Sequence, residues 1–526
     1  MQAFSLAPSL SPPLETVLPG LSSRLVALLT QAAAPNRLAL VGGAVRDLLR
    51  HHLHNDPWTG LPDLDLVVEG FDGPPAAPMA GESVAGACMA GAAVAGACMD
   101  GESIGGERVG GEGVGGASGP QAAPAQDTAA LEQSDDALSA VPATPGLGGS
   151  PAAAELPAAH RLARRLRQLL EPGAVPFLQE HPAYGTVELE VLLPDGALLL
   201  DVATARRETY PEPARNPRVR FARLEDDLAR RDFTINAMAL VLAGAGAERR
   251  EPGVPAGLLD PYGGRADLRQ RQLRFLHPGS VRDDPTRVLR GARYAARLGF
   301  ALAPDSQAQL TGTLAAWPWA WRPGDPPGAA PPALGTRLRM ELELLLEREA
   351  WPRALAALQR WGALVLLDDG LQADRHWHRR LRWAGRAGLP LLPALLAAAA
   401  DPVALAERLQ LPHRQHRLLV GFVQLRRRLR ELAAQGEGDG PGSKGWAADR
   451  WTALLEEPGH GPEAVALALA AGVGPRRPLL RWWLRWRHLD GTLTATALLA
   501  EGLRPGPVLG ERLRRSRLER LAGERC

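Results

Sequence analysis

Two carboxylates spaced two residues apart open an apolar run of this 526-residue chain. Asp63 and Asp65 lie in the sequence DLDLVVEG, in which Leu64 to Val68 is typical of a buried strand. Because alternate residues of a strand project from the same face, both side chains are expected on one face. Carboxylate oxygens are preferred Mg²⁺ ligands, although such a pair is also common in solvated turns. Asp201, at the end of another apolar segment, is either a candidate third carboxylate or a partner for other polar groups.

A glycine pair that can bind phosphate precedes these carboxylates. In VGGAVRDLL, a short strand runs through Gly42 and Gly43 into a helix. Free N–H groups at a helix start donate hydrogen bonds to phosphate oxygens, and a glycine lets the ligand approach the backbone. Arg46, one turn into the helix, can reach the same phosphates with its planar guanidinium group. Glycine pairs are also common in turns that bind nothing, so the motif gains meaning only beside Asp63 and Asp65.

An arginine-rich motif, RRDFTINAMAL, follows at residues 230–240. We expect a helix here, with Arg231 and Asp232 at its start and Asn236 about one turn further on. The arginines can then hold phosphates while the carboxylate and the amide bond a ribose. The alternative is a capped helix that carries no ligand and turns Phe233 and its apolar neighbours toward the core.

A second basic motif is DDPTRVLRGARYAARLGF, residues 283–300. Its arginines recur at helical spacing and form one stripe, which consists of Arg287, Arg290, Arg293 and Arg297. Asp284 lies three residues before the first of them. Such a stripe is usually a solvated helix face. Here Leu289 and Phe300 belong to an adjacent apolar face, so we expect the stripe to border the core.

Several elements must position these motifs. The apolar patterns and turn residues predict strands at Arg37–Val41, Val187–Leu193 and Ala197–Val202, and helices beginning at Ala44 and spanning Ala154–Leu170. Pro194, Asp195 and Gly196 separate the last two strands and indicate a hairpin. From about Leu224 onward the pattern indicates helices, apart from a turn at residues 260–264.

Residues 72–157 differ from the rest of the chain. They include four decapeptide units, AGESVAGACM, AGAAVAGACM, DGESIGGERV and GGEGVGGASG, at residues 80–119. Almost no branched apolar or aromatic side chain is available to offset the entropy of ordering, so we predict a disordered low-complexity insertion. The segment holds eleven acidic residues and one arginine, a net charge of −10. Because the whole chain carries +2, the remainder carries +12, which favours binding to a polyanion.

Composition also disfavours several classes of protein. The longest apolar run, residues 389–400, has 12 residues, whereas a membrane-spanning helix needs about 20. The three cysteines include no Cys-x-x-Cys pair, which argues against a disulfide framework or a zinc site. Without a basic start and an apolar block in residues 1–20, we expect a cytoplasmic protein with no membrane partner.

Taken in order, the motifs GGAVRD, DLD, RRDFTIN, DPYGG and DDPTR resemble those of the class II tRNA nucleotidyltransferase and poly(A) polymerase family. They cover residues 41–300 apart from the insertion, and TRLRMELELLL from Thr336 resembles the helix that follows in the family. One departure is Asp283, where CCA-adding members often have glutamate, and it leaves the nucleotide preference open.

The resemblance implies a role for each motif. Asp63 and Asp65 would be the catalytic ligands of two Mg²⁺ ions. The incoming CTP or ATP would be bound by nine residues: Gly43, Arg46, Arg231, Asp232, Asn236, Asp284, Arg287, Arg290 and Arg293. Among these, Gly43 and Arg46 would contact the triphosphate, Asp232 and Asn236 the ribose, and Asp284 and Arg287 the base edge. The DPYGG turn would act as a hinge.

The resemblance also implies an α+β fold. A small mixed-sheet head like that of DNA polymerase β would occupy residues 1–240, a helical neck with the nucleotide-selecting motif residues 241–320, and a helical, tRNA-binding body and tail residues 321–526. The enzyme would add CCA, or part of it, to tRNA without a template and release pyrophosphate. An A-adding, CC-adding or poly(A)-adding member, or an inactive RNA-binding protein, would share much of this sequence. In the tail, Trp482, Trp483 and Trp486 either stack on bases or pack in the core.

Overall fold

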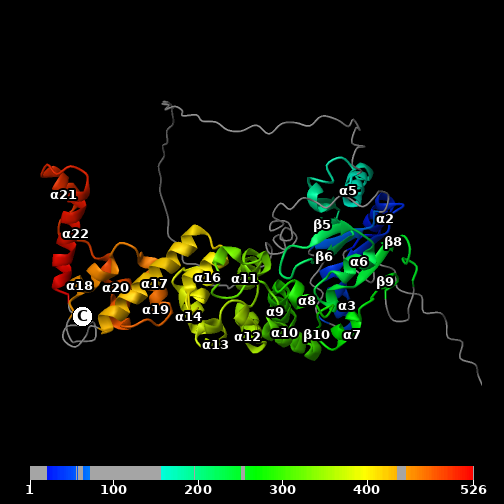
Figure 1. Cartoon of the computed structure of the whole chain (residues 1–526). Coiled ribbons are helices and arrows are strands. Elements are labelled where there is room, and N and C mark those ends of the chain that lie inside the picture. The colour runs from blue at the N-terminus through cyan, green and yellow to red at the C-terminus, as the bar shows by residue number, and fades with distance from the viewer. Residues whose placement is uncertain are drawn as a thin grey trace, which may run out of the picture. The chain divides into compact units, whose positions relative to one another are not determined.

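The computed structural model describes residues 21–54, 56, 63–70, 156–194, 196–249, 255–434 and 446–524 (Figure 1). Most of the predicted insertion, residues 71–155, lies outside this range, as does the side chain of Asp63.

A mixed seven-stranded sheet lies at the N-terminal end of the described chain, with strand order β3-β4-β5-β2-β1-β8-β9 (Figure 1). Strands β2 and β5 are parallel, and every other neighbouring pair in this sheet is antiparallel. The strands are β1 (Leu38–Val41), β2 (Asp63–Val68), β3 (Phe177–His181), β4 (Thr186–Leu193), β5 (Gly196–Thr204), β8 (Ala239–Ala243) and β9 (Leu258–Leu259). The predicted strands at residues 37–41 and 64–68 and the predicted hairpin are therefore confirmed.

Alternation along these strands explains how the sheet is covered. Leu64, Leu66 and Val68 of β2 are buried, and so are the alternating apolar residues of β4 and β5. They form one core with helices α2 (Ser23–Ala33) and α5 (Ala158–Leu169). The opposite face of β2 and β5, which carries Asp65, has little apolar cover except toward the strand ends. The part of this face around Asp65 is thus left to polar groups, whereas a smaller apolar cluster covers the ends of β1, β2 and β8.

The helical interpretation from Leu224 onward is wrong at two places in this sheet. Residues 239–243 and 258–259 form β8 and β9 instead. Strand β8, ALVLA, is almost wholly buried, and a continuous apolar run does not distinguish a strand from a buried helix. The pattern also missed β3 and the two-stranded ribbon of β6 (Arg206–Thr209) and β7 (Arg218–Phe221). The sheet continues past residue 240, and the division into head, neck, body and tail stays a prediction.

Helices dominate the rest of the described chain, apart from the short parallel pair β10 (Gln272–Leu273) and β11 (Ala301–Leu302). They are α3 (Gly42–His54), α6 (Leu224–Ala229), α7 (Gly264–Arg269), α8 (Ser280–Asp283), α9 (Thr286–Leu298), α10 (Pro304–Ala316), α11 (Thr336–Arg348), α12 (Trp351–Arg360), α13 (Asp369–Ala373), α14 (Trp377–Arg386), α15 (Leu391–Leu396), α16 (Pro402–Arg408), α17 (His413–Ala434), α18 (Ala448–Leu455), α19 (Pro462–Ala470), α20 (Arg476–Leu484), α21 (Ala495–Ala500) and α22 (Pro507–Ala522). Within the described residues, no helix has the length and apolar content to cross a membrane.

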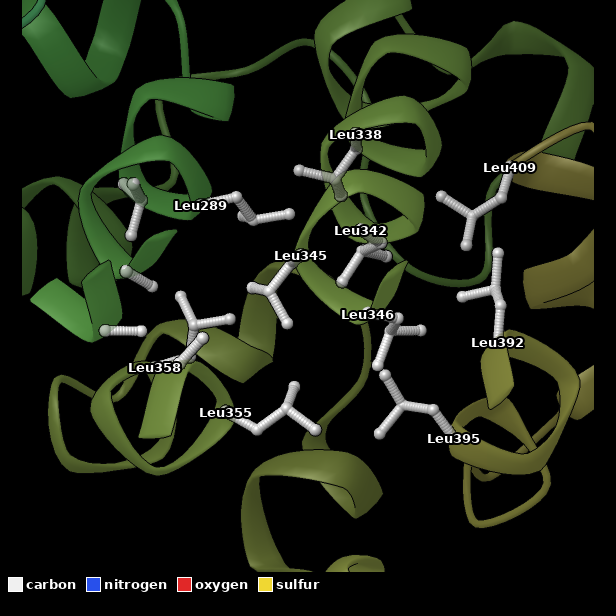
Figure 2. Close-up of a cluster of buried hydrophobic side chains, with 14 of the residues drawn as sticks. Leu289, Leu338, Leu342, Leu345, Leu346, Leu355, Leu358, Leu392, Leu395 and Leu409 are labelled. Atoms are coloured by element: carbon white, nitrogen blue, oxygen red, sulfur yellow. The ribbon is translucent and has the colours of Figure 1, made fainter. Parts of the chain in front are cut away.

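A leucine core fixes α11 against its neighbours. Leu338, Leu342 and Leu345 recur at helical spacing along α11 and point toward α9, α12 and α15 (Figure 2). All three are fully buried. Because α9 and α11 also carry the charged residues described below, this core sets the distance between those charges. In the tail, Trp482 and Trp486 are each 1% exposed, so the core-packing alternative holds for both.

We expect Leu342→Ala to lower the free energy of unfolding by about 2–5 kcal/mol, because a buried leucine leaves a cavity when truncated. The control Leu484→Ala changes a side chain that is 66% exposed and should cost less than about 0.5 kcal/mol. Urea titrations of the two variants measure the difference. Equal losses would contradict the role of α11 in the core.

Candidate functional site

Carboxylates form a row across the polar face of the sheet. In the strand registers, Asp65 of β2 is paired with Asp201 of β5, and Asp201 with Glu188 of β4. Paired residues on neighbouring strands present their side chains to the same face, about 5 Å apart. The structure therefore brings two sequence-predicted carboxylates together and adds Glu188, which the analysis missed. The alternation in TVELEVLL, with glutamates opposite the buried positions, was the available signal.

Gly42 allows the Asp65 carboxylate to lie against the start of α3. Its φ of +70° belongs to the left-handed region, where β1 ends and α3 begins. A Cβ at Gly42 would lie 2.7 Å from Asp65 Oδ2 and 3.3 Å from Arg231 Nη1. Three predicted features thus lie in contact here: the glycine pair, the candidate metal ligand Asp65 and Arg231, which was expected to bind the nucleotide. Gly43 follows inside the first turn of α3.

Arg46 is buried and bonded within the protein. Its Nη1 donates to Asn236 Oδ1 at 3.0 Å, and its Nε and Nη2 donate to the carboxylate of Asp47. Its guanidinium carbon also lies 5.6 Å from the centre of the Tyr294 ring. The motifs predicted separate roles for Arg46, at the phosphates, and Asn236, at the ribose. In the structure the two side chains are hydrogen-bonded to each other.

The helix predicted at residues 230–240 does not form. Helix α6 ends at Ala229, and Thr234–Asn236 makes a single 3₁₀ turn. Phe233 instead forms a β-bridge with Phe275, and their rings stack at 5.1 Å. Phe233 is fully buried, as the apolar pattern required, but this tertiary contact selects an extended backbone over a helix.

Asp232 binds two arginines of the predicted stripe. Its Oδ1 accepts hydrogen bonds from Arg287 Nε at 3.1 Å and Arg290 Nη2 at 2.6 Å. Arg290 and Arg293 also form ion pairs with Glu341 of α11. The stripe on α9 therefore borders the buried interior, as expected, and acidic groups of other elements neutralise it.

Asp284 is 1% exposed, and both of its carboxylate oxygens accept hydrogen bonds. Its Oδ1 accepts from the N–H and the hydroxyl of Thr286, and its Oδ2 accepts from Arg337 Nη2. Burial alone would raise the pKa of Asp284. The guanidinium groups of Arg337, Arg290 and Arg287 outweigh that effect and hold its pKa well below the usual range.

Arg287 is held from four directions. Besides Asp232, it donates to the carbonyl oxygens of Ser280 and Arg230, and its Nη1 lies 3.2 Å from His277 Nε2. Only 1% of the residue is exposed. Asp284 and Arg287 thus lie in one buried charge network, as their proposed joint role requires, and His277 is a partner that the sequence analysis missed.

Helix α11 contributes two further residues that the analysis missed. Arg337 binds Asp284, and Glu341 binds Arg290 and Arg293. They are four residues apart, hence on one face of α11, and both lie in TRLRMELELLL. That spacing of opposite charges was the available signal.

The DPYGG turn caps a helix. The two oxygens of Asp260 accept hydrogen bonds from the backbone N–H groups of Gly264 and Arg265, where α7 begins. A Cβ at Gly264 would lie 2.3 Å from the carbonyl oxygen of Thr234, so glycine is required there. The turn thereby packs against the 3₁₀ turn that contains Asn236. Its action as a hinge stays a prediction.

Within the described residues, no group of three or more His, Cys, Asp or Glu residues is placed to hold a metal ion. The side chain of Asp63, one of the two predicted ligands, lies outside that description. Asp65 and Asp201 offer the oxygen donors that Mg²⁺ prefers, so the donors present fit the expected ion.

Part of this chain is similar to known protein families. The model of the poly A polymerase head domain matches residues 162–274. The CC-adding tRNA nucleotidyltransferase of Deinococcus radiodurans is 39% identical over 283 residues, which are 52% of this chain and 66% of that protein. The A-adding tRNA nucleotidyltransferase of Aquifex aeolicus is 36% identical over 191 residues, or 36% of this chain and 20% of that protein. The chain thus spans less than two thirds of the length of these relatives.

Solved structures agree with the fold. An apo form of a CCA-adding enzyme has a TM-score of 0.56 at 20% identity and covers 96% of this chain and 93% of its own. The Thermotoga maritima CCA-adding enzyme complexed with tRNA_CCA has a TM-score of 0.53 at 19% identity, covering 97% and 95%. The predicted fold class, a mixed-sheet head followed by helices, is confirmed.

We expect Asp284→Asn to lower the stability at pH 7 by about 3–5 kcal/mol, because it leaves buried guanidinium groups without their counter-charge. A carboxylate whose pKa is depressed on folding contributes stability above its unfolded pKa of about 3.9 and loses that contribution as the pH falls further. The difference in the free energy of unfolding between the native protein and the variant should therefore decrease as the pH falls from 5 to 3. Urea unfolding across this range measures this difference. The control Asp305→Asn, at a side chain that is 86% exposed, should change stability little.

Proposed function

The chain belongs to the tRNA nucleotidyltransferase and poly(A) polymerase family, and from that premise we propose that it adds CCA, or part of it, to the 3′ end of tRNA with CTP and ATP. The observation that carries the proposal is the meeting of Asp65, Arg231 and Gly42 at the start of α3. Two charges of opposite sign beside a helix N-terminus suit a nucleoside triphosphate and its cation. We infer that the reaction takes place in the cytoplasm, where these substrates are available.

The sheet face supplies the reaction centre. Asp63, Asp65 and Asp201 would hold Mg²⁺ there, and the ions would favour the deprotonated 3′ hydroxyl and stabilise charge on the leaving pyrophosphate. The first N–H groups of α3 and the guanidinium group of Arg231 bind and orient the triphosphate. The 3′ oxygen of the RNA then bonds to the α-phosphorus as the bond to pyrophosphate breaks, so no covalent enzyme intermediate forms.

Asp284 and Arg287 select the base. A carboxylate accepts hydrogen bonds and a guanidinium donates them, so the pair suits the edges of both cytosine and adenine. Arg287 has five N–H groups and directs four at the described protein, which leaves one Nη2–H for a base. Asp284 accepts three hydrogen bonds and retains a lone pair. Arg290 and Arg293 hold the surrounding network.

Exposed arginines of the C-terminal helices supply the tRNA contact. Arg414 and Arg427 of α17 have side chains that are 85% and 78% exposed, and Arg515 of α22 is 68% exposed. Arginines on such a surface neutralise RNA phosphates, and the binding then weakens as the salt concentration rises.

A second candidate function is the addition of the two cytidines alone. It is favoured by the Deinococcus radiodurans relative, a CC-adding enzyme whose match covers 52% of this chain.

We expect Asp65→Ala to lower the rate of nucleotide addition on the order of 1000-fold or more while the protein still folds and binds tRNA, because it removes a cation ligand at the reaction centre. Glu212→Gln changes a carboxylate that is 72% exposed and serves as the control. Single-turnover kinetics and filter binding separate the two effects. Comparable turnover in Asp65→Ala would mean that the metal ligands lie elsewhere.

The nucleotide specificity is tested with purified protein and a set of tRNAs, from tRNA that lacks CCA to tRNA that ends in CC. Each tRNA is incubated with one nucleotide at a time. We expect CTP to extend the shortest tRNA by two residues and ATP to extend tRNA ending in CC by one. Extension by CTP alone would establish the second candidate. Acceptance of ATP alone, or growth of long adenosine tails, would overturn the CCA proposal.

A further inference from the structure

The base-selecting arginine has one anchor whose chemistry depends on pH. Three groups that accept hydrogen bonds from Arg287 are the Asp232 carboxylate and the carbonyl oxygens of Ser280 and Arg230. Oxygens of this kind accept at any pH near neutrality. The fourth anchor is His277 Nε2, 3.2 Å from Arg287 Nη1. Because a guanidinium only donates, this contact is a hydrogen bond only while Nε2 carries no proton.

His277 is fixed by the turn that precedes α8. Its backbone N–H donates to Ser280 Oγ at 3.3 Å, and its carbonyl oxygen accepts from Ser280 N at 3.0 Å and from Gln309 Nε2 of α10 at 2.9 Å. The backbone of His277 is therefore anchored at both ends by α8 and α10. The backbone position from which the ring reaches Arg287 is thereby fixed.

The charged groups around the ring act mainly against its protonation. Arg287 of α9 and Arg282 of α8 face it as cations, Asp283 of α8 as an anion, and α10 contributes the neutral amide of Gln309. Burial, followed by the charge of Arg287, lowers the pKa of His277 below its ordinary value. The ring is thus neutral at pH 7, and the Arg287 donor favours the tautomer with the proton on Nδ1, in which Nε2 is the acceptor.

We propose that His277 is a positioning residue, which holds Arg287 in the orientation that selects the incoming base by accepting its Nη1–H at an unprotonated Nε2. The inference rests on the proposed function, because it concerns the same site. When Nε2 takes up a proton, two N–H groups face each other and the anchor is lost. Arg287 keeps its other bonds, so the protein stays folded and loses discrimination between bases.

The test compares His277→Gln and His277→Ala with the native protein. The glutamine Oε1 can accept from Arg287 near the position of Nε2 and does not titrate. Discrimination is measured as the ratio of kcat/KM for CTP over UTP, on tRNA lacking CCA, from pH 5.5 to 8. We expect the native ratio to fall only toward the acidic end, because the pKa of His277 lies below its ordinary value. The glutamine variant should keep a high ratio throughout, and the alanine variant should be low at every pH.

His376→Gln is the matched control, since its backbone N–H bonds Asp374 and it lies outside this network. It should reproduce the native profile. The proposal is overturned if His277→Ala discriminates as well as the native protein, or if His277→Gln shows the native loss at acidic pH.

A second measurement needs no nucleotide addition. NMR titration of the His277 ring in the native protein and in Arg287→Gln compares the ring with and without the neighbouring cation. We expect the pKa of His277 to rise in the variant, because a positive charge that opposes protonation has been removed. An unchanged pKa would overturn the proposal. An enzyme that adds no nucleotide, yet shows this rise, would overturn the proposed function and leave the pairing of His277 with Arg287 standing.

Discussion

The site depends on the neutralisation of buried guanidinium groups by carboxylates from other elements. Arg287 and Arg290 share Asp232, which lies beyond α6, and Arg290 and Arg293 share Glu341 of α11. Removing one member of a buried ion pair lowers the free energy of unfolding by about 3–5 kcal/mol. Replacing the whole network by apolar side chains is often neutral for stability. We therefore infer that the network persists for its geometry, which holds the selecting residues in fixed orientations.

Apolar packing provides the precision that this network needs. Leu338, Leu342 and Leu345 pack α11 against α9, so that Glu341 lies 2.7 Å from Arg293 and 3.9 Å from Arg290 (Figure 2). The same division holds at the sheet, where the buried face of β2 positions Asp65 on the opposite face. In both places one face of an element is close-packed in the core, and this packing fixes the charged groups on the element's other face.

The sequence predicted those parts of the site that short spacing determines. Asp63 and Asp65 on one strand, and the arginine stripe on one helix, follow from periods of two and 3.6 residues. The conformation of residues 230–240 did not follow, because the partner of Phe233 is Phe275, far along the chain. Arg337 and His277 were missed for the same reason, since their contacts with Asp284 and Arg287 exist only in three dimensions.

The two proposed base-selecting groups differ from one of their anchors, His277, in how they respond to protons. Arg287 stays charged at all physiological pH values, and the surrounding guanidinium groups keep Asp284 ionised far below neutrality. The donor and acceptor character of the pair is therefore constant, and in the proposed function the protein, rather than a nucleic acid template, would define the pattern that a base must match. Orientation would then be the remaining variable of selection, and anchors such as His277 and Arg337 set it through their contacts with Arg287 and Asp284.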